Sequence, residues 1–394
     1  MTDLETRTAG RPGALRRAAP ALLGYAAVRA LGLLALALWS AARDKSAYTL
    51  LTARWDSLWY TRVAELGYGY EVRLPNGDVH SNLAFFPLLP WLERLGAAAG
   101  LSYADAGFVV SLLASLAAAW GIFAVAEHLY GRRAGVYAVL LWAVLPVGIV
   151  QSMAYSESLF TALAAWSLYA VLTGRWVTAG VLAALAGLTR PVGLAVAAAV
   201  WVAAIVAFVR TRSEAVTDGA HGSPHAPGEG ARRVFGMLLA PLGAAGYVLW
   251  VGHRTGEGPL GYLDVQAGWR NGFDGGVAFA RFVADKFTSF PSALAGVGLI
   301  AGVALLVWLY VVCVRQRQPL ALLVYSGIVT VLALCASSYF GSKPRLLMPA
   351  FPLLLPLALA LARTRTSRSA LIVGGVAVAS AVYGAFWLNG SGPP

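Results

Sequence analysis

Long apolar stretches recur along the whole sequence and limit what this chain can fold into. Eleven of them are candidates for membrane-spanning helices, because about 20 consecutive apolar residues are enough to cross a bilayer. Their predicted bounds are residues 20–42, 103–129, 134–152, 156–172, 176–188, 191–209, 234–251, 291–314, 319–338, 346–362 and 369–388. Only 12% of the residues are charged, about half the share in soluble domains. The sequence therefore predicts an all-α integral membrane protein, with residues 1–394 forming one transmembrane domain.

The fifth stretch, 176–188, is short for a span. It could be a half-helix or a re-entrant piece protected by its neighbours. It could also merge with the stretch at 191–209 into one helix. The charges favour two short crossings, since merging would reverse the side of every later loop. With the N-terminus in the cytoplasm, 16 of the 30 Lys and Arg residues fall inside and 13 outside, and Arg29 lies within the first span. This excess follows the positive-inside rule.

The net charge of +12 has its simplest explanation in this asymmetry. The sequence has no basic stripe with interleaved aromatic residues, so we expect no nucleic-acid partner. The two cysteines lie in apolar stretches, and no Cys/His spacing typical of a metal site occurs. No cofactor is identified, and dependence on a divalent cation is left open. Arginine makes up 27 of the 30 basic residues, as in GC-rich bacterial genomes, so we expect a bacterial plasma membrane.

Four polar segments divide the chain between the apolar stretches. Residues 1–19 form a cytoplasmic N-terminal arm. The segments at 43–102 and 252–290 are too long for turns, and both fall on the outer side. We expect the first to be a catalytic loop with interfacial helices. The segment at 213–230 is rich in Gly, Pro and Ser and predicts a flexible cytoplasmic loop, in which His221 and His225 are solvated linker residues.

The strongest chemical signal is RWDSLWY, from Arg54 to Tyr60, in the first outer segment. Trp55, Trp59, Val63 and Leu66 recur at helical spacing, which predicts a short helix lying flat on the outer membrane surface. A carboxylate at Asp56 would then sit at headgroup depth, where it could take a proton from an acceptor hydroxyl. The alternative is that Asp56 pairs with Arg54 or caps the helix start.

Other charged residues lie at the outer ends of predicted spans. Glu157, in YSESLF, either faces the protein interior or water, or interacts favourably with a helix N-terminus. Arg190, Lys343 and Arg345 are outward cations that break the charge bias. A guanidinium fits phosphate oxygens, so these three are candidates for binding a lipid phosphate, with snorkelling as the alternative. The candidate substrate-binding residues are Arg54, Trp55, Trp59, Tyr60, Glu71, His80 and Glu157.

These pieces together resemble the PIG-V family, the GPI mannosyltransferase 2 type. The resemblance rests on RWDSLWY, AFFPLLP at 84–90, YSESLF at 155–160 and GLTRPVGL at 187–194. PRLLMPAFPLL at 344–354 also resembles the late arginine-bearing segment of polyprenyl-phosphate-dependent enzymes with the GT-C fold. One departure is that Pro191 and Val192 follow the arginine, where eukaryotic relatives have serine and asparagine. This departure leaves the acceptor open.

The resemblance implies a GT-C fold and an inverting mannosyltransferase. The donor would be polyprenyl-phosphate-mannose, the general base Asp56, and the site would lie on the outer face. The acceptor would be a hydroxyl of a glycolipid, lipoglycan or protein. The rival hypothesis is a lipid or small-molecule transporter or flippase, which predicts polar residues near the bilayer midplane and internal repeats. Neither midplane polar residues nor internal repeats are evident. The charges gather instead at the outer boundary.

Overall fold

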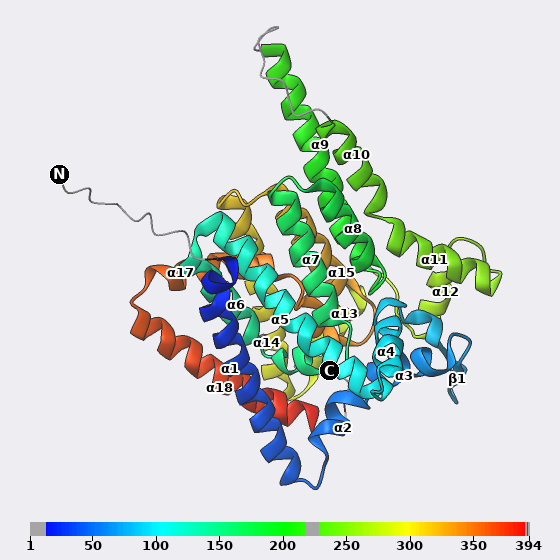
Figure 1. The fold of residues 1–394 in the computed structure, drawn as a ribbon. Helices are drawn as coiled ribbons and strands as arrows, with labels where there is room; N and C mark the ends of the chain where they lie inside the picture. Colours follow the sequence, from blue (N-terminus) through cyan, green and yellow to red (C-terminus); the bar gives the residue numbers. More distant parts are fainter. Residues whose placement is uncertain (1–12, 218–227, 391, 393–394) are drawn as a thin grey trace.

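The computed structural model describes residues 13–217, 228–390 and 392 of the chain. The protein is a mostly helical, multi-pass membrane protein (Figure 1). Six helical segments in the described part are long and apolar enough to cross a membrane. They are α1 (Ala14–Ala41), α5 (Tyr103–Tyr130), α9 (Gly193–Thr217), α10 with α11 (Glu229–Leu239 and Leu242–Thr255), α14 (Ser292–Arg315) and α18 (Thr366–Leu388). His221, His225 and the first twelve residues of the predicted arm lie outside the described residues.

The other five predicted spans are also helical, but they are short or broken. Three are the short apolar helices α7 (Glu157–Leu172), α8 (Trp176–Gly187) and α15 (Leu320–Cys335). The stretch at 134–152 divides into α6 (Arg132–Ala143) and the 3₁₀ turn η2 (Gly148–Ser152). The stretch at 346–362 bends by 75° between η5–α16 (Phe340–Ser342, Lys343–Leu347) and η6–α17 (Phe351–Leu354, Leu355–Arg363). Prolines at 349 and 352 explain this break, because proline lacks the amide donor that continues a helix.

A turn separates α8 from α9, where the charge distribution favours two separate helices. The helices contact each other side by side, so one merged helix is ruled out. A Cβ at Gly193 would come within 2.4 Å of the Gly187 backbone, so the close return of the chain requires glycine. The turn holds Arg190 at the ends of both helices.

Arg29 lies buried inside α1, where an intramembrane charge needs partners. Its guanidinium donates to the backbone carbonyls of Ala143 and Gly148. These carbonyls flank the break between α6 and η2, where no continuing α-helix donates N–H groups to them. Arg29 therefore stabilises a broken span.

The helices pack so that the first and last, α1 and α18, contact each other, and α7 contacts α5, α8 and α9. In Figure 1, α9 and α10 project at the top, while the short elements of residues 43–102 lie toward the lower right. The first outer segment holds α2 (Ala47–Thr52), α3 (Asp56–Leu66), β1 (Glu71–Arg73), β2 (Val79–Ser81), η1 (Asn82–Ala84) and α4 (Leu88–Ala98). The second holds α12 (Gly261–Gly268), α13 (Val277–Asp285) and η4 (Lys286–Thr288). The two segments meet where α12 contacts β2 and η1.

The antiparallel hairpin of β1 and β2 is a small exception to the predicted all-α fold. Its sequence signal is Asn76-Gly77 between the strands, a dipeptide that favours tight hairpin turns.

The helix predicted around RWDSLWY is α3, but its apolar face differs from the prediction. Trp55 precedes the helix instead of lying in it. Val63 is buried, whereas Leu66 is 70% exposed. Trp59 packs against Phe85 and Trp269, so it contributes to an aromatic cluster inside the protein. Helical spacing alone could not reveal these partners, because they come from other segments.

Helix α4 buries a carboxyl group, Glu93, against α5. The residue is fully buried, and neither carboxyl oxygen has a hydrogen-bond partner in the described part of the chain. Its Oε1 occupies the space that a side chain at Gly107 would fill. Burial raises the pKa of Glu93 from its ordinary value of 4.5 to about 9. Glu93 is therefore a neutral, protonated acid at pH 7.

We expect Glu93→Gln to stabilise the protein at pH 8, by up to about 5 kcal/mol. Between pH 4.5 and 9 the folded chain holds a proton that the unfolded chain has lost, so the wild type loses stability as the pH rises through this window. Glutamine has similar polarity and no proton to lose. Thermal unfolding of the purified protein in detergent should show the gap at pH 8 closing toward pH 5. The exposed Glu65→Gln on α3 is the control, and an unchanged pH profile in Glu93→Gln would contradict the assignment.

Candidate active site

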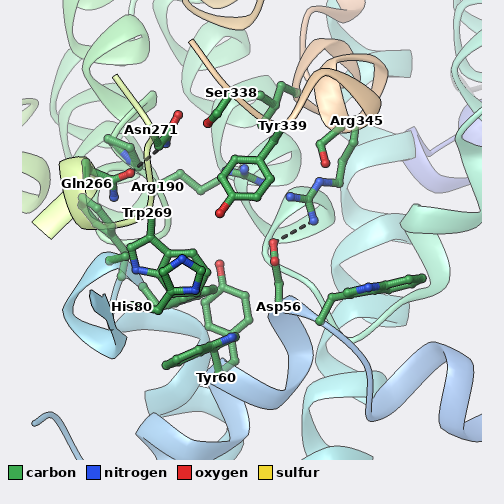
Figure 2. Close-up of a pocket in the computed structure, with 18 of the residues that line it drawn as sticks. Asp56, Tyr60, His80, Arg190, Gln266, Trp269, Asn271, Ser338, Tyr339 and Arg345 are labelled. Carbon is green, nitrogen blue, oxygen red and sulfur yellow. Dashed lines mark hydrogen bonds and ion pairs between the residues drawn. The ribbon is translucent and has the colours of Figure 1, made fainter. Parts of the chain in front are cut away.

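A cavity of about 330 Å³ lies between the two outer segments and the ends of the membrane helices (Figure 2). This volume is at the small end of the range for ligand sites, roughly 300–1,000 Å³. The side chains that line it are Trp55, Asp56, Trp59, Tyr60, His80, Ala84, Phe85, Phe86, Thr189, Arg190, Pro191, Tyr262, Gln266, Trp269, Asn271, Ser338, Tyr339, Ser342, Arg345 and Leu346.

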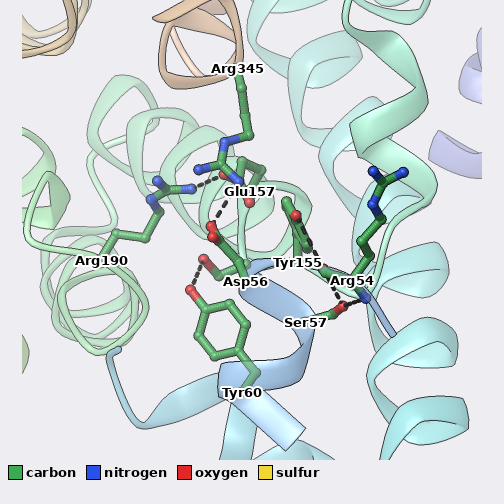
Figure 3. Close-up of polar contacts among 9 residues, drawn as sticks. Arg54, Asp56, Ser57, Tyr60, Tyr155, Glu157, Arg190 and Arg345 are labelled. Carbon is green, nitrogen blue, oxygen red and sulfur yellow. Dashed lines mark hydrogen bonds and ion pairs between the residues drawn. The ribbon is translucent and has the colours of Figure 1, made fainter. Parts of the chain in front are cut away.

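Four charged side chains form a network at one side of this cavity (Figure 3). The Arg345 Nη1 donates to Asp56 Oδ2 at 2.7 Å, and its Nε lies 3.3 Å from Glu157 Oε1. Arg190 forms an ion pair with the same Glu157 oxygen. Two arginines thus balance two carboxylates. The network is neutral overall, and an entering anion would add one uncompensated negative charge.

Asp56 is held by an unusual backbone. It is the first residue of α3. The preceding Trp55 has φ 51° and ψ −119°, a backbone conformation that residues other than glycine rarely adopt. Ser57 Oγ accepts from the Arg54 amide at 2.8 Å and donates to the Arg54 carbonyl at 2.7 Å, which fixes the turn. Strained residues of this kind concentrate at functional sites. Of the five non-glycine residues with positive φ in the described part of the chain, Trp55 and Tyr339 line the cavity.

Glu157 forms ion pairs with both arginines of the network. It opens α7, where a carboxylate interacts favourably with the helix N-terminus, and it is 1% exposed. Both of the sequence-level alternatives for this residue therefore apply, since it faces the interior and begins a helix. It does not line the cavity. The neighbouring Ser156 shares a 2.7 Å hydrogen bond with Tyr60, which ties α7 to α3.

The cavity brings together most of the residues singled out from the sequence. Its lining includes the candidate base, two of the three candidate phosphate ligands, and four of the seven candidate substrate-binding residues: Asp56, Arg190, Arg345, Trp55, Trp59, Tyr60 and His80. Asp56 pairs with Arg345, which is distant in sequence, and not with its neighbour Arg54.

Three other candidates have their side chains elsewhere. Arg54 donates to the carbonyls of Leu388 and Gly390, and its guanidinium lies 3.7 Å from the centre of the Trp55 ring. The Lys343 ammonium donates to three carbonyls at and just beyond the C-terminus of α15. Glu71 is exposed in β1. None of the three lines the cavity.

The second outer segment and the loop after α15 supply lining residues that were not predicted from sequence. Gln266, Trp269 and Asn271 come from α12 and the turn that follows it, and Ser338 and Tyr339 come from the loop after α15. Their only sequence signal is a Trp with neighbouring amides in a long outer segment. In the described part of the chain, no group of three or more His, Cys, Asp and Glu side chains is placed to hold a metal ion.

Comparison with known proteins shows which family model and which folds the chain resembles. A family model described as dolichyl-phosphate-mannose-protein mannosyltransferase matches residues 82–220, a segment that contains Glu157 and Arg190 but neither Asp56 nor Arg345. A search of curated proteins found no match.

Solved structures resemble the chain over most of its length. ArnT from Cupriavidus metallidurans, bound to undecaprenyl phosphate, matches with a TM-score of 0.50 and 15% identity over 90% of this chain and 62% of that chain. The oligosaccharyltransferase AglB from Archaeoglobus fulgidus, with an inhibitory peptide and a dolichol-phosphate, gives 0.46 and 12% over 94% of this chain and 56% of that chain. The chain therefore spans less than two thirds of the length of either protein. Its likeness to ArnT confirms the predicted GT-C fold.

Proposed function

We propose that the chain is a membrane glycosyltransferase of the PIG-V type, which transfers mannose from a polyprenyl-phosphate carrier to an acceptor hydroxyl. The observation that carries this proposal is that the Asp56 carboxylate, paired with Arg345, lines the same cavity as the guanidiniums of Arg345 and Arg190. A base and a phosphate site are the two groups that a direct displacement at a sugar phosphate requires. The GT-C fold and the matched family description support the same class.

In this mechanism the acceptor oxygen attacks the anomeric carbon while the bond to the carrier phosphate breaks. Asp56 takes the proton of the acceptor hydroxyl, and the leaving phosphate carries away the bonding electrons. Negative charge therefore grows on the phosphate oxygens, where Arg345 and Arg190 can stabilise it. The configuration inverts, and no covalent intermediate is needed.

The ion pair between Asp56 and Arg345 couples the two substrates. While the pair is intact, Asp56 Oδ2 accepts a hydrogen bond from Arg345, so this oxygen is not free to accept the proton of an acceptor hydroxyl. The carrier phosphate offers Arg345 another anionic partner. We infer that the donor binds before the acceptor loses its proton.

Mannose, the outer face and a bacterial plasma membrane are parts of the same proposal. Support for mannose comes from the description of the matched family and from the resemblance to PIG-V. The charge bias supports an outer site, since the network lies in segments on the side with fewer Lys and Arg residues. The acceptor would be a glycolipid, lipoglycan or protein hydroxyl.

We expect the purified full chain, in liposomes of bacterial lipid, to transfer radiolabelled mannose from polyprenyl-phosphate-mannose to extracted lipoglycans, glycolipids or proteins. Mass spectrometry of a deletion strain should show the same acceptor lacking one hexose. Liposomes without protein are the control. Movement of the donor across the liposome membrane with no transfer to any acceptor would contradict the proposal and favour a flippase.

A further inference from the structure

The cavity has a second side that carries no formal charge. The Gln266 and Asn271 amides and the Ser338 hydroxyl line it, away from the pair of Asp56 and Arg345 (Figure 2). The proposed reaction assigns no task to these three groups.

These three side chains keep unused hydrogen-bonding capacity. Gln266 Nε2 donates to the Tyr262 hydroxyl at 2.6 Å, and Asn271 Nδ2 donates to Gln266 Oε1 at 2.7 Å. Asn271 Oδ1 and the second N–H of Gln266 form no hydrogen bond within the described residues. Ser338 Oγ is buried and has no partner there either. A buried polar atom without a partner is costly, so this side of the cavity is suited to a polar ligand.

Aromatic rings surround the polar groups. Trp269 stacks on His80 with ring centres 4.0 Å apart. The rings of Trp59 and Trp269 pack edge to face, with their centres 4.9 Å apart. Burial lowers the pKa of His80 below its ordinary value, which keeps the imidazole neutral at pH 7. Apolar ring surface beside neutral donors and acceptors matches a sugar ring, which has both C–H and hydroxyl faces.

The segments that carry these groups are held rigidly. Trp269 Nε1 donates to the Ser81 carbonyl at 3.0 Å, and Arg270 pairs with Asp78 at 2.6 Å, which ties the turn to the hairpin. The Gly272 amide donates to Ser337 Oγ, and the Ser337 amide donates to the Gly272 carbonyl, both at 2.9 Å. A site fixed before binding loses less entropy when the ligand enters.

We propose that Gln266, Asn271 and Ser338 form the subsite for the hydroxyls of the transferred sugar and select a neutral hexose. This inference rests on the proposed function. Each sugar hydroxyl can donate and accept, as can the amide pair. An amino sugar would bring an ammonium group to a wall without a carboxylate, because Asp56 is the one acidic residue in the lining and is paired with Arg345.

Binding of two lipids to the purified full chain separates this subsite from the phosphate site. Polyprenyl phosphate carries no sugar, whereas polyprenyl-phosphate-mannose carries both groups. We expect Gln266→Ala and Asn271→Ala to weaken binding of the mannosyl lipid by about tenfold and to leave binding of polyprenyl phosphate unchanged. Ser338→Ala should act in the same direction and breaks no hydrogen bond in the described structure. The exposed Gln316→Ala, at the end of α14, is the matched control.

A second measurement tests selection among sugars. With glucosyl and mannosyl lipids, which differ in the configuration of one hydroxyl, the variants should discriminate less between the two donors than the wild type does. Equally weakened binding of the glucosyl and mannosyl lipids, or a change in acceptor KM alone, would overturn the sugar subsite. Transfer by the wild type would still support the proposed function in that case. A wild type that binds neither lipid would instead overturn the proposed function.

Discussion

Replacing Asp56 with asparagine should reduce sugar transfer by about 10²–10⁴-fold, the contribution typical of a general base. Asparagine has the shape of aspartate but cannot take the proton of an acceptor hydroxyl. Donor binding should persist or strengthen, because the amide competes less with the phosphate for Arg345. The expected result is therefore a loss of kcat without a loss of donor affinity, measured by transfer assays and by binding of polyprenyl-phosphate-mannose.

Folding provides the control for this variant. Arg345 keeps Glu157 as a partner when Asp56 is neutral, so the protein should fold and elute as the wild type does. Glu65→Gln, which removes an exposed carboxylate from the same helix α3, should retain full transfer. Transfer by Asp56→Asn within a few-fold of the wild type would show that another group removes the proton.

The parts of the fold that follow from hydrophobic pattern and charge could be predicted from the sequence. Apolar length located the helices, and the Lys and Arg distribution favoured separate helices at 176–188 and 191–209, as observed. The outward cations were singled out because they break the charge bias, and two of them, Arg190 and Arg345, line the cavity. Both signals are local or additive along the chain, which is why sequence is enough.

Lys343 and Arg345 illustrate what sequence could not separate. Residues two apart on a helix point about 200° apart, so they cannot serve the same site. The structure directs Arg345 to Asp56, while the Lys343 ammonium binds carbonyls left without partners where α15 ends. The place where α15 ends depends on the loop after it, which has no strong local signal. Gln266 and Asn271 were missed for a related reason, since their role depends on α12 docking against β2.

Arg345→Gln should weaken binding of polyprenyl phosphate by about 30-fold or more, because truncating one partner of a buried charge pair costs about 2–5 kcal/mol. Arg345→Lys should recover part of this affinity, since it keeps the charge but loses the forked donors. Acceptor KM should change little. The exposed Arg368→Gln on α18 is the control. A variant that loses acceptor affinity alone would contradict the phosphate role.

The same substitution tests whether the ion pair restrains the base. In a double-mutant cycle, Asp56→Asn and Arg345→Gln should show non-additive effects on thermal stability, because their side chains are in direct contact. Each single change leaves one charge of the pair uncompensated, whereas the double change leaves none, and Glu157 still pairs with Arg190. The double variant should therefore be more stable than the sum of the single changes predicts. Additive effects would mean that the pair contributes little in the free protein, and that the donor has no ion pair to break before Asp56 can act.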